Sequence, residues 1–341
     1  MENWTGQLEN GQVPEATLAA QYIISHTLGL SRAELKRNMN TVLSRQQLSE
    51  VERRMTCRLE RMPLQYIIGE WTFRNLTLNL QPPVFIPRPE TEQLVDLALE
   101  CLAEVERPRV LEICCGSGAV CLSLLHAKHD VECVAVDQSQ HAIRLTKENA
   151  RKLNLQHRLT VLEGKVKLNT GVTDTIPPPY TNTRDTTIPL DTPRRDTTTP
   201  TPPPPSTTTP ITTPTPTPTI TTPTPPITPI PLPHTTYDLV LANPPYVLRK
   251  DLMNLQPEIM MYEDLRALDG GKDGLDVIKA ILHLSHTLLL QGSHLILEVD
   301  PCHPYLIPTW LQKQPQLKMK MTKVYVDFSG KERFIKFTKC S

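Results

Sequence analysis

The sequence has no long apolar run, no excess of either charge and no Cys-x-x-Cys pair. Its 341 residues include 36 basic and 36 acidic side chains, so no long-range field attracts the phosphates of a nucleic acid. The apolar runs are shorter than the roughly 20 residues that a membrane-spanning helix needs. None of the eight cysteines forms a Cys-x-x-Cys pair, which indicates a reduced, intracellular protein without structural zinc. We therefore expect no membrane span, no metal site and no direct contact with nucleic acid.

Proline and threonine, in contrast, are concentrated in one segment. Between Asp174 and Thr236 they make up 44 of 63 residues. Such a segment buries little apolar surface and has few amides to pair, so we expect a disordered insertion over residues 174–236. A glycosylated or partner-binding stalk is one interpretation, and a surface insertion or translated noncoding repeat is the other. When these 63 residues are taken from the 341, the remaining 278 have the composition of one globular protein.

The N-terminal part of the sequence changes its periodicity along the chain. Helical spacing predicts a small helical domain, which we assign to residues 1–65. The segment LQYIIGEWTFRNLTLNL alternates apolar and polar residues as hairpin strands do, and we assign a hairpin connector to residues 66–90. The following VFIPRPETEQLVDLALECL predicts a strand and then a helix that Glu90 or Thr91 caps. Residues 91–341 are expected to form the main domain, which the insertion interrupts.

From Pro108 the pattern changes to strands that alternate with helices. Five short apolar segments are predicted as strands, namely VLEIC, VECVAVD, RLTVLEG, YDLVLANPPY and SHLILEVD. The segments CGSGAVCLSLLHA and QHAIRLTKENARKLN are predicted as helices between them. This alternation predicts an α/β fold with a parallel sheet that helices cover on both faces. Ligands of such sheets bind beyond the carboxyl ends of the strands.

Candidate binding residues lie at these carboxyl ends. They are Glu112 and the turn Cys115-Gly116-Ser117-Gly118 after the first strand, Asp137 after the second and Asn243 after the fourth. Glycines let a ligand approach the backbone, and an acidic residue such as Asp137 can accept hydrogen bonds from both hydroxyls of a ribose. A turn that only packs the helix on the strand is the alternative. Because Cys121 stands where the dinucleotide pattern has its third glycine, we favour S-adenosylmethionine over a nicotinamide cofactor.

The fourth strand ends on Asn243-Pro244-Pro245-Tyr246, which suits methylation of a planar amide or ring amine. The nitrogen of such a group is a poor nucleophile, and it reacts when both its hydrogens are held and its lone pair faces a methyl donor. The side-chain carbonyl of Asn243 and the backbone carbonyl of Pro244 can accept these hydrogens. The two prolines hold the carbonyls rigidly, and Tyr246 offers a flat wall for the substrate. An Asn-Pro turn that simply ends a strand is the alternative.

With these motifs, the sequence resembles the PrmC/HemK family of glutamine-N5 methyltransferases, which modify the Gly-Gly-Gln glutamine of peptide-chain release factors. The resemblance rests on the helical N-domain and on LQYIIGEWTF, FIPRPETE, LEICCGSGAV, AVDQSQHAI, NPPYV and EDLRALDGGKDGLDVI. It implies a class I S-adenosylmethionine-dependent methyltransferase, with a Rossmann-like parallel sheet and an antiparallel edge. It further implies that Cys114 to Gly118 and Asp137 hold S-adenosylmethionine, that Asn243 to Tyr246 hold the glutamine amide, and that the helical domain grips the release factor.

The chain departs from the family pattern at two places. Cys114 stands where the family usually has glycine, and the segment after the third strand, which normally carries an aspartate beside the adenine, runs into the insertion. Arg88 and Glu90 are a charged pair in the proline-bracketed turn, and they either contact the substrate or only fix the loop. Two other function classes stay open: a nucleic-acid adenine or guanine amine methyltransferase that acts on a flipped base, and a binding protein that the insertion makes inactive.

The resemblance also implies a partner and a location. Eukaryotic relatives with this helical domain act on organellar release factors, and the proline and threonine repeat suggests a eukaryotic genome. We therefore expect a monomeric mitochondrial protein that acts on a mitochondrial release factor. The N-terminal stretch MENWTGQLENG has the character of neither a signal peptide nor a transit peptide, so an upstream segment would have to supply the import signal.

Overall fold

The computed structural model describes residues 2–38, 42–166 and 232–341, all of which fall within one unit of the fold. Most of the insertion predicted from composition, residues 174–231, lies outside the described residues. The segments on either side of it, β5 (Leu159–Glu163) and β6 (Tyr237–Ala242), are strands of the same sheet.

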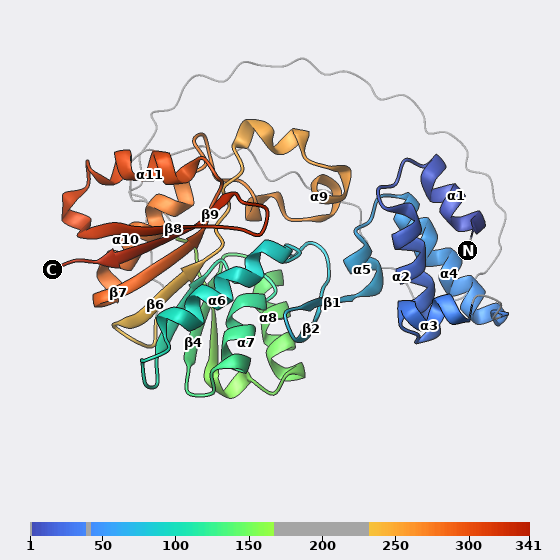
Figure 1. The fold of residues 1–341 in the computed structure, drawn as a ribbon, viewed down its shortest axis with the longest axis horizontal. Helices are drawn as coiled ribbons and strands as arrows, with labels where there is room; N and C mark the ends of the chain where they lie inside the picture. The colour runs from blue at the N-terminus through green and yellow to red at the C-terminus, as the bar shows by residue number, and fades with distance from the viewer. Residues whose placement is uncertain (1, 39–41, 167–231) are drawn as a thin grey trace, which may run out of the picture. The chain divides into compact units, whose positions relative to one another are not determined.

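The described residues at the N-terminus form a domain of five short helices (Figure 1). They are α1 (Glu2–Asn10), α2 (Ala16–Leu28), α3 (Arg32–Arg37), α4 (Arg45–Leu59) and α5 (Leu64–Ile68). Ser31 and Ser44 begin α3 and α4 with capping boxes, which satisfy amide groups that the first helical turn leaves free. The apolar faces of the helices meet around Leu8, Ile23 and Met55, which are fully buried. The predicted helical N-terminal domain is confirmed.

An antiparallel hairpin of β1 (Glu70–Phe73) and β2 (Leu76–Asn79) follows the helical domain. The prediction that LQYII belongs to a hairpin strand is wrong, because these residues form α5. Their apolar side chains at positions 64, 67 and 68 have helical spacing, and Gly69 ends the helix in the left-handed conformation with a φ of 85°. The alternation that indicated a strand therefore applies only from Glu70 onward.

The strand predicted within VFIPRPETE is also wrong. Residues 84–88 have irregular backbone, and they lead into a 3₁₀ turn, η1 (Pro89–Thr91), and helix α6 (Glu92–Cys101). The amide of Ile86 donates to the Glu263 carboxylate at 3.3 Å rather than to a neighbouring strand. Thr91 directly precedes α6, but its side chain makes no capping hydrogen bond. Its hydroxyl is used instead in the site described below.

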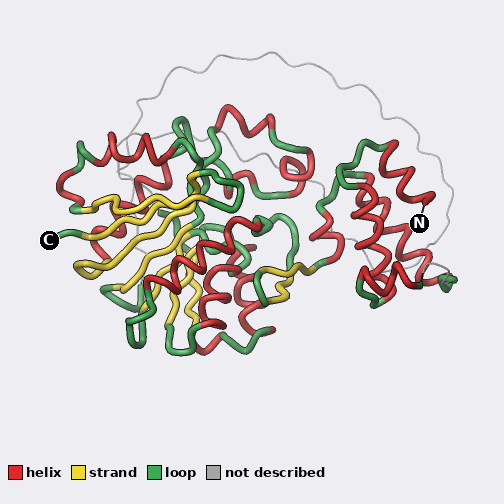
Figure 2. Tube along the Cα trace, viewed as in Figure 1, coloured by secondary structure: helices red, strands yellow, loops and turns green. Residues whose placement is uncertain are grey.

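A seven-stranded sheet lies at the centre of the main domain in the described part of the chain (Figure 2). Its order is β5-β4-β3-β6-β7-β9-β8, with β3 (Arg109–Ile113), β4 (Glu132–Asp137), β7 (Leu289–Glu298), β8 (Met319–Val326) and β9 (Glu332–Lys339) beside the two strands already named. The strands from β5 to β7 pair in parallel, whereas β9 pairs with both β7 and β8 in antiparallel fashion. The predicted parallel sheet with an antiparallel edge is confirmed.

Helices cover both faces of the sheet (Figure 1). One face carries α6, α7 (Ala119–Ala127) and α8 (Gln140–Lys152), and the other carries α10 (Asp276–Leu288) and α11 (His303–Leu311). Successive residues of β3 enter opposite cores, because Val110 packs in the first and Leu111 in the second. The short helix α9 (Pro257–Tyr262) and four 3₁₀ turns complete the described part of the fold. These turns are η2 (Gln156–Arg158), η3 (Arg249–Asn254), η4 (Leu265–Ala267) and η5 (Pro315–Leu317).

Candidate active site

The glycine turn between β3 and α7 is a tight loop with left-handed backbone at Cys114, Gly116 and Gly118, whose φ angles are 64°, 54° and 81°. A Cβ on Gly118 would lie 2.9 Å from the Thr146 side chain, so this glycine allows α7 and α8 to pack closely. A Cβ on Gly116 would meet no atom within 4 Å. Gly116 therefore lies against open space, where a ligand can approach the backbone.

The side chains of the other turn residues point into the protein. Cys115 and Ser117 are 5% and 2% exposed, and Cys115 Sγ lies 3.6 Å from the Thr146 hydroxyl. The carbonyl of Ser117 accepts a hydrogen bond from Asn149 Nδ2 at 3.0 Å, which fixes the turn on α8. From these two residues, only the backbone is available to a ligand.

Asp137 ends β4 directly beside this turn. Its Oδ2 accepts the amide hydrogen of Gly116 at 3.0 Å, and its Oδ1 accepts that of Ser139 at 2.9 Å. Burial raises the pKa of this carboxyl, while the two amide hydrogen bonds oppose the rise. Each carboxylate oxygen has a second lone pair, so Asp137 can still accept hydrogens from the hydroxyls of a ribose. The open glycine and this carboxylate together fit the nucleoside part of S-adenosylmethionine.

Glu112 lies under the turn, in the middle of the fold. It is 3% exposed, and its Oε2 accepts the amide hydrogen of Cys121 at 3.0 Å. Burial raises the pKa of the Glu112 carboxyl to about 8. This hydrogen bond ties β3 to the first turn of α7.

Asn243 to Tyr246 follow β6, one strand from the glycine turn, because Ala242 pairs with Ile113. Asn243 Nδ2 donates to the hydroxyl of Thr91 at 3.2 Å, which leaves the Asn243 carbonyl oxygen free for another partner. Tyr246 is half-buried, and its ring meets His303 edge to face, with ring centroids 6.4 Å apart. Burial raises the pKa of the Tyr246 hydroxyl to about 12. The phenol is therefore neutral at physiological pH.

The backbone after Asn243 is held by the segment that contains LDGGKDG. Val247 donates to the Leu268 carbonyl at 2.9 Å, and Gly270 donates back to the Val247 carbonyl at 2.8 Å. A Cβ on Gly270 would lie 2.7 Å from Tyr246 Cα, and one on Gly274 would lie 2.8 Å from the Tyr246 carbonyl oxygen. This support was not predicted from the sequence, although the clustered glycines are a signal for a close backbone approach.

Arg88 does not pair with Glu90, as its place in the turn suggested, but with Glu263. The distance from Arg88 Nη2 to Glu263 Oε1 is 2.7 Å, and the Glu263 side chain is 1% exposed. Burial raises the pKa of Glu263, while the Arg88 guanidinium opposes that rise. Arg88 and Glu263 also line a cavity of about 400 Å³ between the turn and the helical domain. Because Arg88 lines this cavity, it can fix the loop and still face a ligand.

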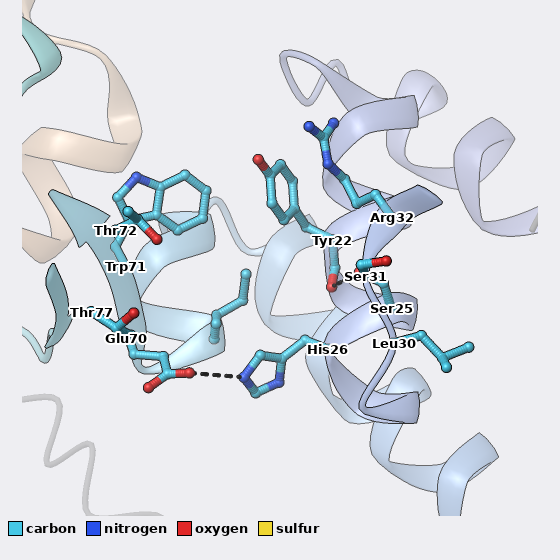
Figure 3. A pocket seen from close by; sticks show the side chains of 11 residues that line it. Tyr22, Ser25, His26, Leu30, Ser31, Arg32, Glu70, Trp71, Thr72 and Thr77 are labelled. Atoms are coloured by element: carbon cyan, nitrogen blue, oxygen red, sulfur yellow. Dashed lines mark hydrogen bonds and ion pairs between the residues drawn. The ribbon is translucent and has the colours of Figure 1, made fainter. Parts of the chain in front are cut away.

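A second cavity, of about 460 Å³, lies between α2 and the β1–β2 hairpin. Figure 3 shows Tyr22, Trp71 and Arg32 around it, with the two aromatic rings 5.1 Å apart and the guanidinium 4.4 Å from the Tyr22 ring centre. His26 and Glu70 close another side, with Nε2 and Oε1 4.0 Å apart. This cavity is lined by the helical domain and the hairpin rather than by the strand ends.

The described residues contain no group of three or more histidine, cysteine, aspartate or glutamate side chains that could hold a metal ion. Among these residues, no helix has both the length and the apolar character that crossing a membrane requires.

Family models match two stretches of the chain. Residues 1–69 match the PrmC N-terminal domain, and residues 76–190 match the methyltransferase small domain. The MTRF1L release factor glutamine methyltransferase of Homo sapiens is 36% identical over 98% of this chain and 85% of that protein. The release factor glutamine methyltransferase of Gloeobacter violaceus is 28% identical over 82% of this chain and 76% of that protein.

Similarity to solved structures is weaker. The N-terminal domain of human METTL16 in complex with SAH has a TM-score of 0.43 and 13% identity, over 77% of this chain and 76% of that chain. The family assignment rests on the sequence relatives, of which the human protein matches nearly the whole chain. The chain belongs to the release factor glutamine methyltransferases and is an S-adenosylmethionine-dependent enzyme that methylates the glutamine of a release factor.

Proposed function

We propose that Asn243 and Pro244 hold the glutamine amide of the release factor with their two carbonyl oxygens. The observation that carries this proposal is the hydrogen bond from Asn243 Nδ2 to Thr91, because it turns the Asn243 carbonyl oxygen away from Thr91 and leaves it free. The two hydrogens of the substrate amide need two acceptors, and the carbonyls of Asn243 and Pro244 supply them. Neither Pro244 nor Pro245 has an amide hydrogen, so no backbone donor competes with the substrate there.

The cofactor lies, in this proposal, over Cys114 to Gly118 with its ribose on Asp137. The support is the pairing of β4 with β3 and of β3 with β6, which brings Asp137, the glycine turn and Asn243 to one edge of the sheet. Adjacent strands lie about 4.8 Å apart, so the ribose partner and the amide partner are about 10 Å apart across two strand spacings. Bound S-adenosylmethionine supplies an electrophilic methyl group. The chain supplies orientation, since Asn243 and Pro244 direct the lone pair of the amide nitrogen toward that methyl group.

Tyr246, Arg88 and Glu90 complete the proposed substrate site. The Tyr246 backbone is fixed by Gly270 and Gly274, which supports its ring as a rigid wall beside the planar amide. Arg88 lines a cavity next to the helical domain, and this supports a contact with the polypeptide around the glutamine. Glu90 lies in the same turn, two residues from Arg88.

We propose that the helical domain, residues 1–65, binds the body of the release factor, and that the partner and the location are mitochondrial. The domain is tied to the main domain by Glu258, whose carboxylate lies 3.2 Å from Arg58 Nη1 and 2.8 Å from Arg61 Nε. These ion pairs support a helical domain that holds a bound release factor at a fixed distance from Asn243. Imaging of the tagged endogenous protein tests the location, and a purely cytosolic signal would exclude a mitochondrial one.

The proposed domain plan is a hairpin connector at residues 66–90 and a methyltransferase domain at residues 91–341, with residues 174–236 as a dispensable insertion. Lengthening a loop from about 10 to about 70 residues costs roughly 1.7 kcal/mol of closure entropy. We therefore expect the enzyme without residues 174–236 to have an equal or higher melting temperature and undiminished affinity for S-adenosylmethionine. If the enzyme without residues 174–236 failed to fold or lost its activity, the insertion would be a functional part of the enzyme.

The site assignment is tested with Asn243→Ala and labelled S-adenosylmethionine. The acceptors are a release factor with its Gly-Gly-Gln motif, the same factor with alanine for that glutamine, and DNA and rRNA. We expect kcat on the intact release factor to fall at least about 10²-fold in the variant, while cofactor affinity by calorimetry stays unchanged. Near-normal turnover of the variant would contradict the role of Asn243, and labelling of DNA or rRNA would instead support a base amine acceptor.

A further inference from the structure

Glu298 is a buried acid that the proposed function leaves without a role. It is the last residue of β7, and β7 pairs with β6 so that Leu297 lies opposite Ala242. Glu298 therefore sits at the same sheet edge as Asn243. It is 2% exposed, and its Oε2 is buried without a hydrogen-bond partner in the described residues. A carboxyl group buried in this way is costly, so its presence at this place calls for a function.

Thr91 contacts Asn243 at this edge of the sheet. Thr91 is 3% exposed, and its Oγ1 accepts the hydrogen bond from Asn243 Nδ2 at 3.2 Å. A hydroxyl that accepts one hydrogen bond still has its own hydrogen to donate. Burial raises the pKa of Glu298 to about 7, while hydrogen bonding from Thr91, the charge of Arg333 and hydrogen bonding from Asn243 act against that rise. The Thr91 hydroxyl and the Asn243 amide are thus the donors that face this carboxyl.

The direction of these hydrogen bonds determines which end of the Asn243 amide the substrate meets. If the Thr91 hydrogen goes to Glu298, then Thr91 Oγ1 must accept from Asn243 Nδ2, and the Asn243 carbonyl faces the substrate. If Glu298 did not accept, the Thr91 hydroxyl could donate to the Asn243 carbonyl instead. The Asn243 amide would then rotate and present its NH₂ group to the NH₂ group of the glutamine, so that two donors would face each other.

We propose that Glu298 and Thr91 are positioning residues that fix the orientation of the Asn243 amide for methyl transfer. This rests on the assignment of Asn243 to the substrate amide. Glu298 accepts the Thr91 hydrogen, Thr91 accepts from Asn243, and the Asn243 carbonyl is held toward the substrate. No proton is transferred along this chain of three groups. These three groups contribute to catalysis by holding the substrate amide in position, because a small misplacement of a reacting group can cost about 10²-fold in rate.

The proposal is tested with Glu298→Gln, Thr91→Val and the matched control Thr91→Ser, which keeps the hydroxyl. A glutamine at position 298 can donate to Thr91 as well as accept from it, so it no longer imposes one direction. We expect kcat to fall about 10- to 100-fold in Glu298→Gln and in Thr91→Val, with Thr91→Ser within about 3-fold of the parent. The dissociation constant for S-adenosylmethionine should stay within about 3-fold in all three, because none of these groups faces the ribose end.

A purely structural role for Glu298 gives a different result. In that case the variants would lower the melting temperature but keep the parent kcat when assayed well below it, and this result would overturn the proposal. The double variant Thr91→Val with Glu298→Gln should lose no more activity than the worse single variant, because both act through one orientation. If the activity losses of the two single variants multiplied in the double variant, Thr91 and Glu298 would act independently, and this result would also overturn the proposal. Asn243→Ala is assayed in parallel, since full activity there would refute the site assignment rather than the positioning role.

Discussion

Gly270 provides the most direct test of how the Asn-Pro-Pro-Tyr segment is held. A Cβ at this position would lie 2.7 Å from Tyr246 Cα, 2.8 Å from the Tyr246 carbonyl carbon and 2.9 Å from Gly274 Cα. All three neighbours are backbone atoms, so none can move by a side-chain rotation. Ordinary contacts begin at 3.4 Å, and the Tyr246 backbone would have to shift by the difference between 3.4 and 2.7, about 0.7 Å. A shift of this size reaches the scale at which catalytic alignment is lost.

We therefore expect Gly270→Ala to lower kcat by about 10²-fold. Overpacking of this kind costs about 1–3 kcal/mol of stability, which lowers the melting temperature by roughly 2–10 °C for a domain of this size. The affinity for S-adenosylmethionine should be unchanged, because the glycine turn and Asp137 lie on other strands. Calorimetry for the cofactor, turnover on a release factor and thermal unfolding measure the three effects.

The control for this experiment is Gly6→Ala in α1, where a Cβ would meet nothing within 4 Å. Alanine is also the better helix former, so this variant should unfold at the same or a higher temperature with normal turnover. If Gly270→Ala behaved like Gly6→Ala, the segment after Asn243 would have to tolerate displacement. A rigid segment would then not be needed to align the substrate, which would refute this role of Gly270.

Three further outcomes are expected. Asp137→Ala should weaken S-adenosylmethionine binding at least about 10-fold, because the acceptor proposed for two ribose hydroxyls is lost. An unchanged dissociation constant by calorimetry would show that Asp137 does not hold the ribose. Cys114 has a φ of 64°, a backbone conformation in which a β-branched residue is strained. Cys114→Val should therefore unfold at a clearly lower temperature than Cys114→Gly. Equal melting temperatures of the two variants would mean that the turn adopts another backbone conformation. Burial raises the folded-state pKa of Glu298 to about 7, so the native state holds its proton more tightly than the unfolded state does. The contribution of Glu298 to the free energy of unfolding is then fully present below pH 4.5 and is lost as the pH rises through about 7. Between pH 5 and pH 8, denaturant unfolding should therefore show a smaller loss of stability for Glu298→Gln than for the parent.

The fold and the strand-end residues could be predicted because their signals are local in the sequence. A strand, a glycine turn and a helix follow one another within a few residues of Gly116, and parallel pairing then brings Asp137 and Asn243 to the same edge. The two wrong strands came from short segments in which apolar spacing fits both structures. LQYII has apolar residues at helical spacing as well as alternation, and only the structure shows that α5 forms.

The contacts that orient the site could not be predicted, because they join segments that lie far apart in the chain. Thr91 and Asn243 are 152 residues apart, and Arg88 and Glu263 are 175 residues apart. A periodic pattern identifies which face of an element is buried, but it does not identify the partner of a buried polar group. Glu298 had a signal of its own, since a charged residue at the carboxyl end of the apolar segment SHLILEVD matches the position of Asp137 and Asn243.

The choice of a protein as substrate must come from outside the Asn-Pro-Pro-Tyr segment, because its two carbonyls would serve an exocyclic amine of a base as well as a glutamine amide. Contacts within the chain link the helical domain to this segment. Glu258 holds the helical domain through Arg58 and Arg61, and Glu263, at the end of the same short helix, holds Arg88.

The turn that carries Arg88 ends at Thr91, which holds Asn243. The domain proposed to bind the release factor and the side chain proposed to bind its glutamine are therefore joined by successive hydrogen bonds, with only a few residues of backbone between them. A base that enters the site without a protein attached would meet the same carbonyls but would make no contact with the helical domain. On this argument the binding energy of the release factor, rather than the chemistry of the amide, selects the substrate.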